Sequence, residues 1–220
     1  MKQLFYILLC FTLFSCQTGT PEQSETKDTT AVVNDIKNSV ILDDMLAVKD
    51  EAEFISMFGK ENVVRDTIWG PEGMFSMGTI LFPNTEKQVE IMWEDTVNNA
   101  YSLSLEISAR YNEGWEYSSY WKTKDGVTIG STLTELVAIN EKPINFLGVG
   151  WDYGGNIMSY NGGKLDSAGI GVTLDIEDTQ TQNEEAYQKV VGDVELNSES
   201  AEVKALTFKV IRIAVLSARN

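Results

Sequence analysis

The sequence predicts an α+β domain in which two tandem units each place a short helix before an antiparallel β-meander, with the helices packed on one sheet. Two observations favour this fold. A helix-start signal occurs twice, and each time alternating apolar residues follow it. When the chain is slid against itself until Trp69 meets Trp151, Gly73 also meets Gly155. The 220 residues suffice to bury a substantial core without metals or disulfides.

The two helix starts are at Asp50 and Thr132. In each, the cap side chain can accept a hydrogen bond from a first-turn amide, and a glutamate three residues later can reach back to the cap. Gly59 is expected to end the first helix, and Pro143, which cannot continue the helical hydrogen bonding, bounds the second. We therefore expect two short helices in corresponding places.

Runs with period-two alternation predict half-buried antiparallel strands after each helix. A glycine-rich turn follows Trp69 and Trp151, and we expect both indole rings to plug the core beneath these turns. An acidic loop over 175–185 and a helical turn or two over 185–191 precede the last strand, which has an irregularity near Ile211. The predicted first unit spans about 43–110 with strands near 78–82, 89–93 and 103–107, the second spans about 125–176 with strands near 157–160 and 170–176, and the last strand covers about 207–217.

Residues 1–15 have the pattern of a signal peptide. Lys2 is followed by an apolar run from Leu4 to Phe14, and a helix of that length, at about 1.5 Å per residue, covers only about half of a roughly 30 Å hydrocarbon core. This stretch is therefore a cleaved leader and not a membrane-spanning helix.

The residues Leu13, Ser15 and Cys16 resemble the lipobox of bacterial lipoproteins, although Phe14 stands where that family usually has a small residue. The resemblance implies that Cys16 becomes an acylated N-terminus that holds the protein to a lipid bilayer. Gln17 resembles the class sorted to the outer membrane, so the expected location is the cell envelope. The alternative is ordinary secretion. Polar residues dominate 16–35, which predicts a disordered tether before a single domain over 36–220.

Charge and composition exclude several functions. The formal net charge is −16, and loss of Lys2 with the leader lowers it to −17. Such a surface repels phosphate backbones, so we expect no nucleic-acid partner. The chain has no histidine, and its two cysteines are Cys10 in the leader and Cys16. Histidine-dependent catalysis, a zinc site and dithiol redox chemistry are therefore excluded, and we expect no metal and no cofactor.

One segment resembles a family of small envelope proteins. The residues GVTIGSTLTELVAINEKPINF at 126–146 resemble a pattern in the barrel-assembly lipoprotein and the two-repeat β-lactamase inhibitor protein, and GVGWDYGGNI at 148–157 is similar to uncharacterised lipoproteins of Gram-negative bacteria. The first resemblance is to a two-repeat fold, and the second brings no activity with it.

Two aromatic groups are candidate binding residues, because tryptophan and tyrosine dominate binding hot spots. Each also has a structural interpretation, since aromatic residues cover sheets and an aspartate can cap a turn. The candidates are Trp115, Tyr117, Tyr120 and Trp121 in the first group, and Trp151, Asp152 and Tyr153 in the second.

The favoured hypothesis is a non-enzymatic envelope module for protein binding or assembly, with an inhibitor-like variant in which a concave sheet binds a basic envelope protein. One alternative is a carbohydrate-binding lipoprotein that stacks a glycan on exposed tryptophan and tyrosine rings. A remote alternative is a hydrolase that uses two carboxylates among Glu113, Glu116 and Asp152.

Overall fold

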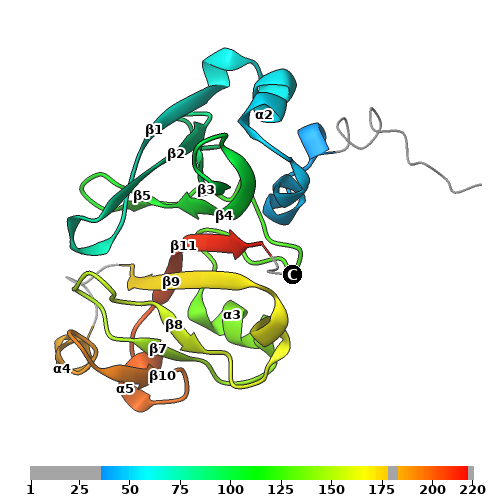
Figure 1. The fold of residues 1–220 in the computed structure, drawn as a ribbon. Helices are drawn as coiled ribbons and strands as arrows, with labels where there is room; N and C mark the ends of the chain where they lie inside the picture. Colours follow the sequence, from blue (N-terminus) through cyan, green and yellow to red (C-terminus); the bar gives the residue numbers. More distant parts are fainter. Residues whose placement is uncertain (1–35, 178–182, 218–220) are drawn as a thin grey trace, which may run out of the picture.

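The computed structural model describes residues 36–177 and 183–217 and shows an α+β fold made of two stacked units (Figure 1). The predicted leader at 1–15, the lipidation site at Cys16 and the tether at 16–35 lie outside the described residues. In the part that the structure describes, no helix is both long enough and apolar enough to span a membrane.

The first unit consists of short helices and a four-stranded meander, followed by a small hairpin. Its elements are η1 (Leu42–Ala47), α2 (Glu51–Phe58), η2 (Lys60–Asn62), β1 (Val63–Trp69), η3 (Pro71–Gly73), β2 (Phe75–Leu81), β3 (Val89–Asp95), β4 (Ala100–Ser108), β5 (Arg110–Tyr111) and β6 (Trp115–Glu116). The second unit repeats the helix and the strands with insertions. It contains α3 (Leu133–Asn140), β7 (Asn145–Leu147), β8 (Ile157–Ser159), η4 (Lys164–Ser167), β9 (Ile170–Ile176), α4 (Glu184–Gln188), β10 (Glu195–Asn197), α5 (Ala201–Lys204) and β11 (Phe208–Leu216).

The element boundaries confirm the predicted tandem arrangement. The offset that aligns Trp69 with Trp151 also aligns the first residue of α2 with that of α3, and the first residues of β1 and β2 with those of β7 and β8. The start of β9 departs from this alignment with β3 by a single position. The units differ in their last connection, because a short turn joins β3 to β4, whereas a segment carrying α4, β10 and α5 lies between β9 and β11.

The two units share one six-stranded sheet with the strand order β1-β2-β3-β4-β11-β9. Within this sheet, β4, which ends the first meander, pairs antiparallel with β11, which ends the second, and Ile213 lies opposite Ile107 (Figure 1). A second sheet has the order β10-β7-β8, and a bridge between Asn156 and Thr173 joins its edge to β9. The expected irregularity in the last strand is confirmed as a register shift between Val210 and Arg212.

The helix ends follow the predicted chemistry except that Glu53 accepts from the Lys49 amide and not from the amide of the cap residue Asp50. Asp50 accepts a hydrogen bond from the Glu53 amide at 2.9 Å, and Gly59 ends α2 with a φ of 88°. Thr132 caps α3 in a complete capping box, in which its side chain and that of Glu135 each accept from the other residue's backbone amide. The local sequence alone therefore determines where both helices begin.

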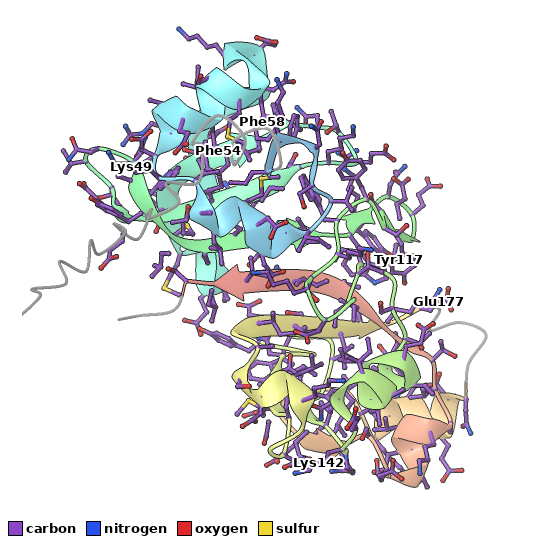
Figure 2. All side chains as sticks on the ribbon, turned by 90° about the vertical axis from the view of Figure 1, so that its right-hand side faces the viewer. Lys49, Phe54, Phe58, Tyr117, Lys142 and Glu177 are labelled. Carbon is purple, nitrogen blue, oxygen red and sulfur yellow. The ribbon has the colours of Figure 1, made fainter. Side chains whose placement is uncertain are left out.

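The core of the first unit lies between α2 and the sheet. Phe54 is fully buried and packs edge-on against Trp93, with 6.1 Å between the ring centroids. Figure 2 shows Phe54 and Phe58 beneath α2. The indole nitrogen of Trp93 donates to the Thr79 hydroxyl at 2.8 Å, and that hydroxyl donates to Glu51 at 2.5 Å. This chain of hydrogen bonds fixes the start of α2 on the sheet.

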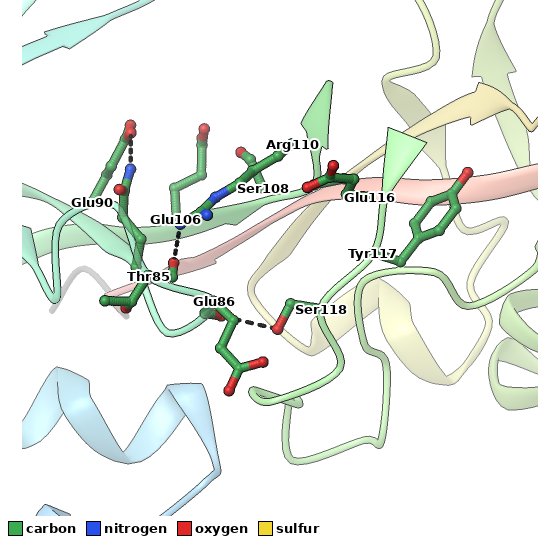
Figure 3. A pocket seen from close by; sticks show the side chains of 11 residues that line it. Thr85, Glu86, Glu90, Glu106, Ser108, Arg110, Glu116, Tyr117 and Ser118 are labelled. Carbon is green, nitrogen blue, oxygen red and sulfur yellow. Dashed lines mark hydrogen bonds between the residues drawn. The ribbon is translucent and has the colours of Figure 1, made fainter. Parts of the chain in front are cut away.

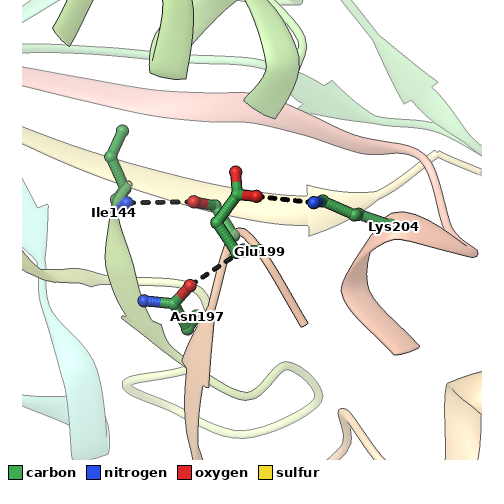
Figure 4. Close-up of polar contacts among 5 residues, drawn as sticks. Ile144, Asn197, Glu199 and Lys204 are labelled. Carbon is green, nitrogen blue, oxygen red and sulfur yellow. Dashed lines mark hydrogen bonds and ion pairs between the residues drawn. The ribbon is translucent and has the colours of Figure 1, made fainter. Parts of the chain in front are cut away.

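The core of the second unit is closed by its inserted segment. Phe146 of β7 packs edge-on against Phe208 of β11 at 5.2 Å. The Ile144 amide donates to the Ser198 hydroxyl at 3.0 Å, and Lys204 forms an ion pair with Glu199 at 2.6 Å (Figure 4). The hydrogen bond from Ile144 and the pairing of β10 with β7 hold the inserted segment against β7, and the ion pair lies within the inserted segment.

The expectation that Trp69 and Trp151 plug the core is wrong. Trp69 is 68% exposed and Trp151 is 37% exposed. Trp69 contacts Phe75 at the end of the β1–β2 hairpin, where neither strand has a further sheet neighbour. Trp151 donates from its indole nitrogen to the Gly148 carbonyl at 2.9 Å and lies on the surface of its own loop.

Candidate functional site

The six-stranded sheet has one face packed on the core and one face turned away from it, which we call the open face. On β3, Ile91 and Trp93 are buried in the core, so the intervening side chains point to the opposite side. The strand pairs extend this alternation across the sheet. The polar open-face side chains include Glu90, Ser104, Glu106, Ser108, Arg212, Thr173 and Asp175.

Two carboxylates lie side by side at the centre of the open face. Glu90 and Glu106 are direct partners on the neighbouring strands β3 and β4. Arg212 of β11 approaches Glu106, with 3.2 Å between Nε and Oε1. Burial raises the pKa of both carboxyl groups, the charge of Arg212 opposes that rise, and the charge of Glu90 raises the pKa of Glu106 further. A cation placed here would offset the repulsion between the charges of Glu90 and Glu106.

A cavity of about 440 Å³, which we call the carboxylate cavity, opens beside this pair. Four glutamates and a single arginine line it. The arginine, Arg110, donates to the Thr85 carbonyl, and Ser118 donates to the Glu86 carbonyl at 2.9 Å (Figure 3). The residues lining it are Thr85, Glu86, Gln88, Glu90, Glu106, Ser108, Ala109, Arg110, Glu116, Tyr117 and Ser118.

The outer part of the β1–β2 hairpin, residues 66–78, overhangs the open face, and we call it the arm. The strands β1 and β2 pair along their full length, but β2 pairs with β3 only from Thr79 to Leu81. At Gly78 an added Cβ would lie 2.3 Å from the Ile68 side chain and 2.5 Å from the Ile91 carbonyl oxygen, so the arm leaves the sheet at a residue without a side chain. In Figure 1 the hairpin runs from beneath α2 toward β9.

Two features of the arm bear on binding. A cavity of about 580 Å³ lies between its residues 68–76 and the open-face side chains Met92, Glu106 and Arg212. The tip exposes a group of large apolar side chains, among which Trp69 is 68% and Phe75 is 65% exposed. An exposed apolar group of this kind marks an interaction site more often than chance.

A third cavity, of about 210 Å³, continues the open face toward the second unit. Trp151, Asp152, Asp175 and Arg212 line it. The indole nitrogen of Trp115 donates to Asp175 at 3.0 Å, so this part of the structure brings together residues from both predicted aromatic groups. Burial raises the pKa of Asp175, and hydrogen bonds from the Ile176 amide and from Trp115 oppose that rise.

The three cavities adjoin one another along the open face, since Glu106 lines the first two and Arg212 lines the second and third, and we call them together the groove. The amide of Glu72 at the arm tip donates to Asp152 at 3.1 Å. This contact joins the corresponding turns of the two units across the groove.

The other predicted site residues have structural partners. Trp121 is only 4% exposed and donates to the Lys87 carbonyl at 3.0 Å, so it is a core residue and not a ligand platform. The Lys87 ammonium lies over the Tyr120 ring at 4.4 Å. Tyr153 packs edge-on against Trp151 at 5.5 Å.

Tyr117 lines the carboxylate cavity beneath a lysine. The ammonium of Lys209 lies 4.8 Å from the centre of its ring and also forms an ion pair with Glu177, and Figure 2 places Tyr117 and Glu177 close to the junction of the units. Burial raises the pKa of Tyr117 to about 12, and the negative charges of Glu177 and Asp175 act in the same direction.

Sequence reasoning missed the groove floor, namely Glu90, Glu106, Asp175 and Arg212. Glu90, Glu106 and Asp175 each lie between buried apolar residues of a strand, so period-two alternation places them on the face opposite the core. That signal was available. Arg212 lies on that face because of the irregularity after Val210. The sequence did not indicate that β4 pairs with β11, which is what brings Arg212 to Glu106.

Within residues 36–177 and 183–217, no three aspartate, glutamate, cysteine or histidine residues are grouped so as to hold a metal ion. The fold and the site together define a two-unit α+β domain with an acid-lined groove on its open sheet face. Comparison with known protein families, curated proteins and solved structures finds no match to this chain. The resemblances drawn from segments 13–16, 126–146 and 148–157 therefore rest on those residues alone.

Proposed function

We propose that this protein is a non-enzymatic binding module whose open sheet face receives a positively charged segment of another envelope protein. The observation that carries the proposal is the pair Glu90 and Glu106, held side by side in a groove where burial raises the pKa of both. Carboxylates that are partly removed from water gain more from a cationic partner than freely hydrated ones do.

The charge of the whole chain supports the same kind of partner. At a formal net charge of −16, the protein attracts basic surfaces over distances longer than a direct contact. Electrostatic steering of this kind raises association rates and rejects acidic partners. The exposed side chains of Trp69 and Phe75 beside the groove supply apolar contact area, which charge alone does not provide.

The place of action is part of the proposal. Acyl chains on Cys16 would hold the module at the outer membrane, with residues 16–35 as the tether. The test is the intact mass of the membrane-extracted protein and of a Cys16→Ala variant. The proposed anchor predicts that the variant loses the lipid mass and leaves the membrane fraction. An unchanged mass and location would contradict it.

The alternatives find less support in the site. A glycan-stacking platform needs open ring faces, but Trp121 is buried and lysine side chains cover the Tyr117 and Tyr120 rings. The hydrolase predicted from Glu113, Glu116 and Asp152 is not favoured, because Glu116 lines the carboxylate cavity whereas Asp152 lines the cavity near Trp151.

A defined peptide tests the binding surface. The probe is a fluorescently labelled nine-residue peptide that alternates lysine and valine, and its comparison peptide carries glutamate in place of lysine. The variant Glu86→Gln with Glu90→Gln removes two charges from the carboxylate cavity. We expect the wild-type protein to bind only the lysine peptide, and the variant to bind it about tenfold or more weakly, which corresponds to about 1.4 kcal/mol.

The matched control is Glu61→Gln with Asp125→Asn, which removes the same charge from two exposed residues that line none of the three cavities. Equal losses in the two variants would show that net charge and not the groove is responsible. Absence of binding to the lysine peptide by the wild-type protein would contradict the proposed function.

A further inference from the structure

The arm and the open face border a solvent-open cavity that has the size of a ligand site. The cavity of about 580 Å³ lies within the range of about 300–1,000 Å³ that is usual for such sites. Ile68, Phe75 and Ser76 line it from the arm, and Met92, Glu106 and Arg212 line it from the sheet. Its two walls therefore belong to parts of the chain that are not paired with each other.

The arm is attached to the rest of the protein mainly at its base. Its base pairs with β3 through the short register from Thr79 to Leu81. At its tip, the bond from the Glu72 amide to Asp152 is a single exposed contact of 3.1 Å. An exposed hydrogen bond contributes only about 1 kcal/mol or less. The contact can therefore open at small cost while the rest of both units stays folded.

We propose that the arm is a clamp, and that the partner segment lies between the arm and the open face as an extended chain. This inference rests on the proposed function, and it specifies the partner as a strand-like segment that alternates cationic and apolar side chains. Binding requires the bond between Glu72 and Asp152 to open, and the arm then closes over the bound segment.

The chemistry of the two walls selects this alternation. Successive side chains of an extended chain point to opposite sides. Cationic side chains on one side meet Glu106, which lines both this cavity and the carboxylate cavity, and apolar side chains on the other side meet Ile68 of the arm. A folded basic surface presents no free strand of this kind, and the tip contact between Glu72 and Asp152 limits how far a bulky surface can enter beneath the arm.

A reversible cross-link tests the clamp. In the full chain with Cys10→Ser and Cys16→Ser, the changes Glu72→Cys and Asp152→Cys place one thiol on each of the two residues whose backbone amide and carboxylate now meet. Oxidation locks the arm, and reduction releases it in the same protein. Gel mobility and thiol titration report the fraction locked, and Asp152→Ala serves as a second variant in which the tip contact is absent.

We expect the oxidised protein to associate with the lysine–valine peptide about tenfold or more slowly than the reduced protein, because the closed arm excludes an entering chain. We expect Asp152→Ala to associate faster than the wild-type protein. Equal association rates and equal Kd values for the oxidised and reduced forms would overturn the clamp and leave the proposed function standing. Absence of binding in both forms and in the wild-type protein would contradict the proposed function itself.

Discussion

At the scale of single residues, the groove floor keeps charged groups where an apolar side chain would fold more favourably. Glu90 and Glu106 face each other, and Arg212 forms an ion pair with Glu106. Removing carboxylates from water costs free energy unless they are fully paired. A stability loss that the fold does not require is expected at functional sites. This observation is the residue-scale argument for a binding role.

Replacing Glu90 by glutamine tests this cost. Because burial raises the pKa of Glu90 above 4.5, the folded state holds the proton more tightly than the unfolded chain does. The protonated carboxyl group therefore makes its full contribution to the free energy of unfolding at low pH, and this contribution is lost as the pH rises through the raised pKa. We expect Glu90→Gln to be more stable than the wild-type protein at neutral pH, with the difference vanishing in acid.

Urea unfolding at about pH 7 and about pH 4 measures this difference in the free energy of unfolding, which we expect to stay below about 1 kcal/mol because Glu90 remains partly hydrated. The exposed residue Glu94 on the same strand supplies the control, Glu94→Gln, for which we expect no gain. A Glu90→Gln variant that is less stable than the wild-type protein at neutral pH would show that the carboxylate stabilises the fold.

At this scale the sequence predicted which residues cap helices better than it predicted which aromatic side chains are buried. The capping residues Asp50 and Thr132 act as expected, because a cap depends only on its neighbours along the chain. The indole rings of Trp69 and Trp151 were placed in the core, and both are exposed instead. Burial of a turn residue depends on what packs against the turn, and the local sequence does not contain that information.

At the scale of elements, the tandem repeat fixes corresponding helices and strands but not the contacts that they make. Gly73 and Gly155 occupy corresponding turns and have φ values of 71° and 74°. Beyond Gly73 there is open space at the arm tip, whereas Gly155 lies against β9. The same turn therefore ends a free hairpin in one unit and packs against a strand in the other.

Changing each of these glycines to alanine separates the two effects. Both changes carry the cost of a left-handed residue, about 1–2 kcal/mol. An alanine Cβ at Gly155 would also lie 1.8 Å from the Leu174 carbonyl oxygen, whereas at Gly73 it would meet nothing within 4 Å. We expect Gly155→Ala to lose at least about 2 kcal/mol more than Gly73→Ala in thermal or urea unfolding. Equal losses would contradict the packing of the second turn on β9.

Element prediction succeeded where alternation was strong and missed β1 and β7, for which no strand was predicted. The strands β3, β4, β9 and β11 lie where alternating apolar residues placed them. The outer half of the β1–β2 hairpin shows no pattern that indicates its departure from the sheet. Gly78 marks the point of departure, but a glycine within a strand can equally mark a bulge.

At the scale of the whole molecule, the candidate site belongs to neither unit alone. The pairing of β4 with β11 places Arg212 of the second unit beside Glu106 of the first, and the arm of the first unit reaches Asp152 of the second. The groove therefore exists only because the units join through their last strands. A repeat recognised in the sequence predicts two similar units but does not predict how they join.

The charge of the whole molecule gives a prediction for solution conditions. A binding site steered by a net charge of −16 weakens as salt screens it. Between about 50 and 500 mM salt, we expect the Kd for the lysine–valine peptide to rise by about tenfold, mostly through a slower association rate. Stopped-flow fluorescence measures both rate constants. A Kd that does not change over this range would contradict electrostatic steering.

Backbone amide shifts in the NMR spectrum of the full chain show where the peptide binds, and so test whether the open face is the binding surface. Titration with the lysine–valine peptide is expected to shift the amides of β3, β4 and β11 around Glu90, Glu106 and Arg212, together with those of the arm. Shifts confined to α2, α3 and the inserted segment around α5, with the open face unchanged, would show that the peptide does not bind on the open face.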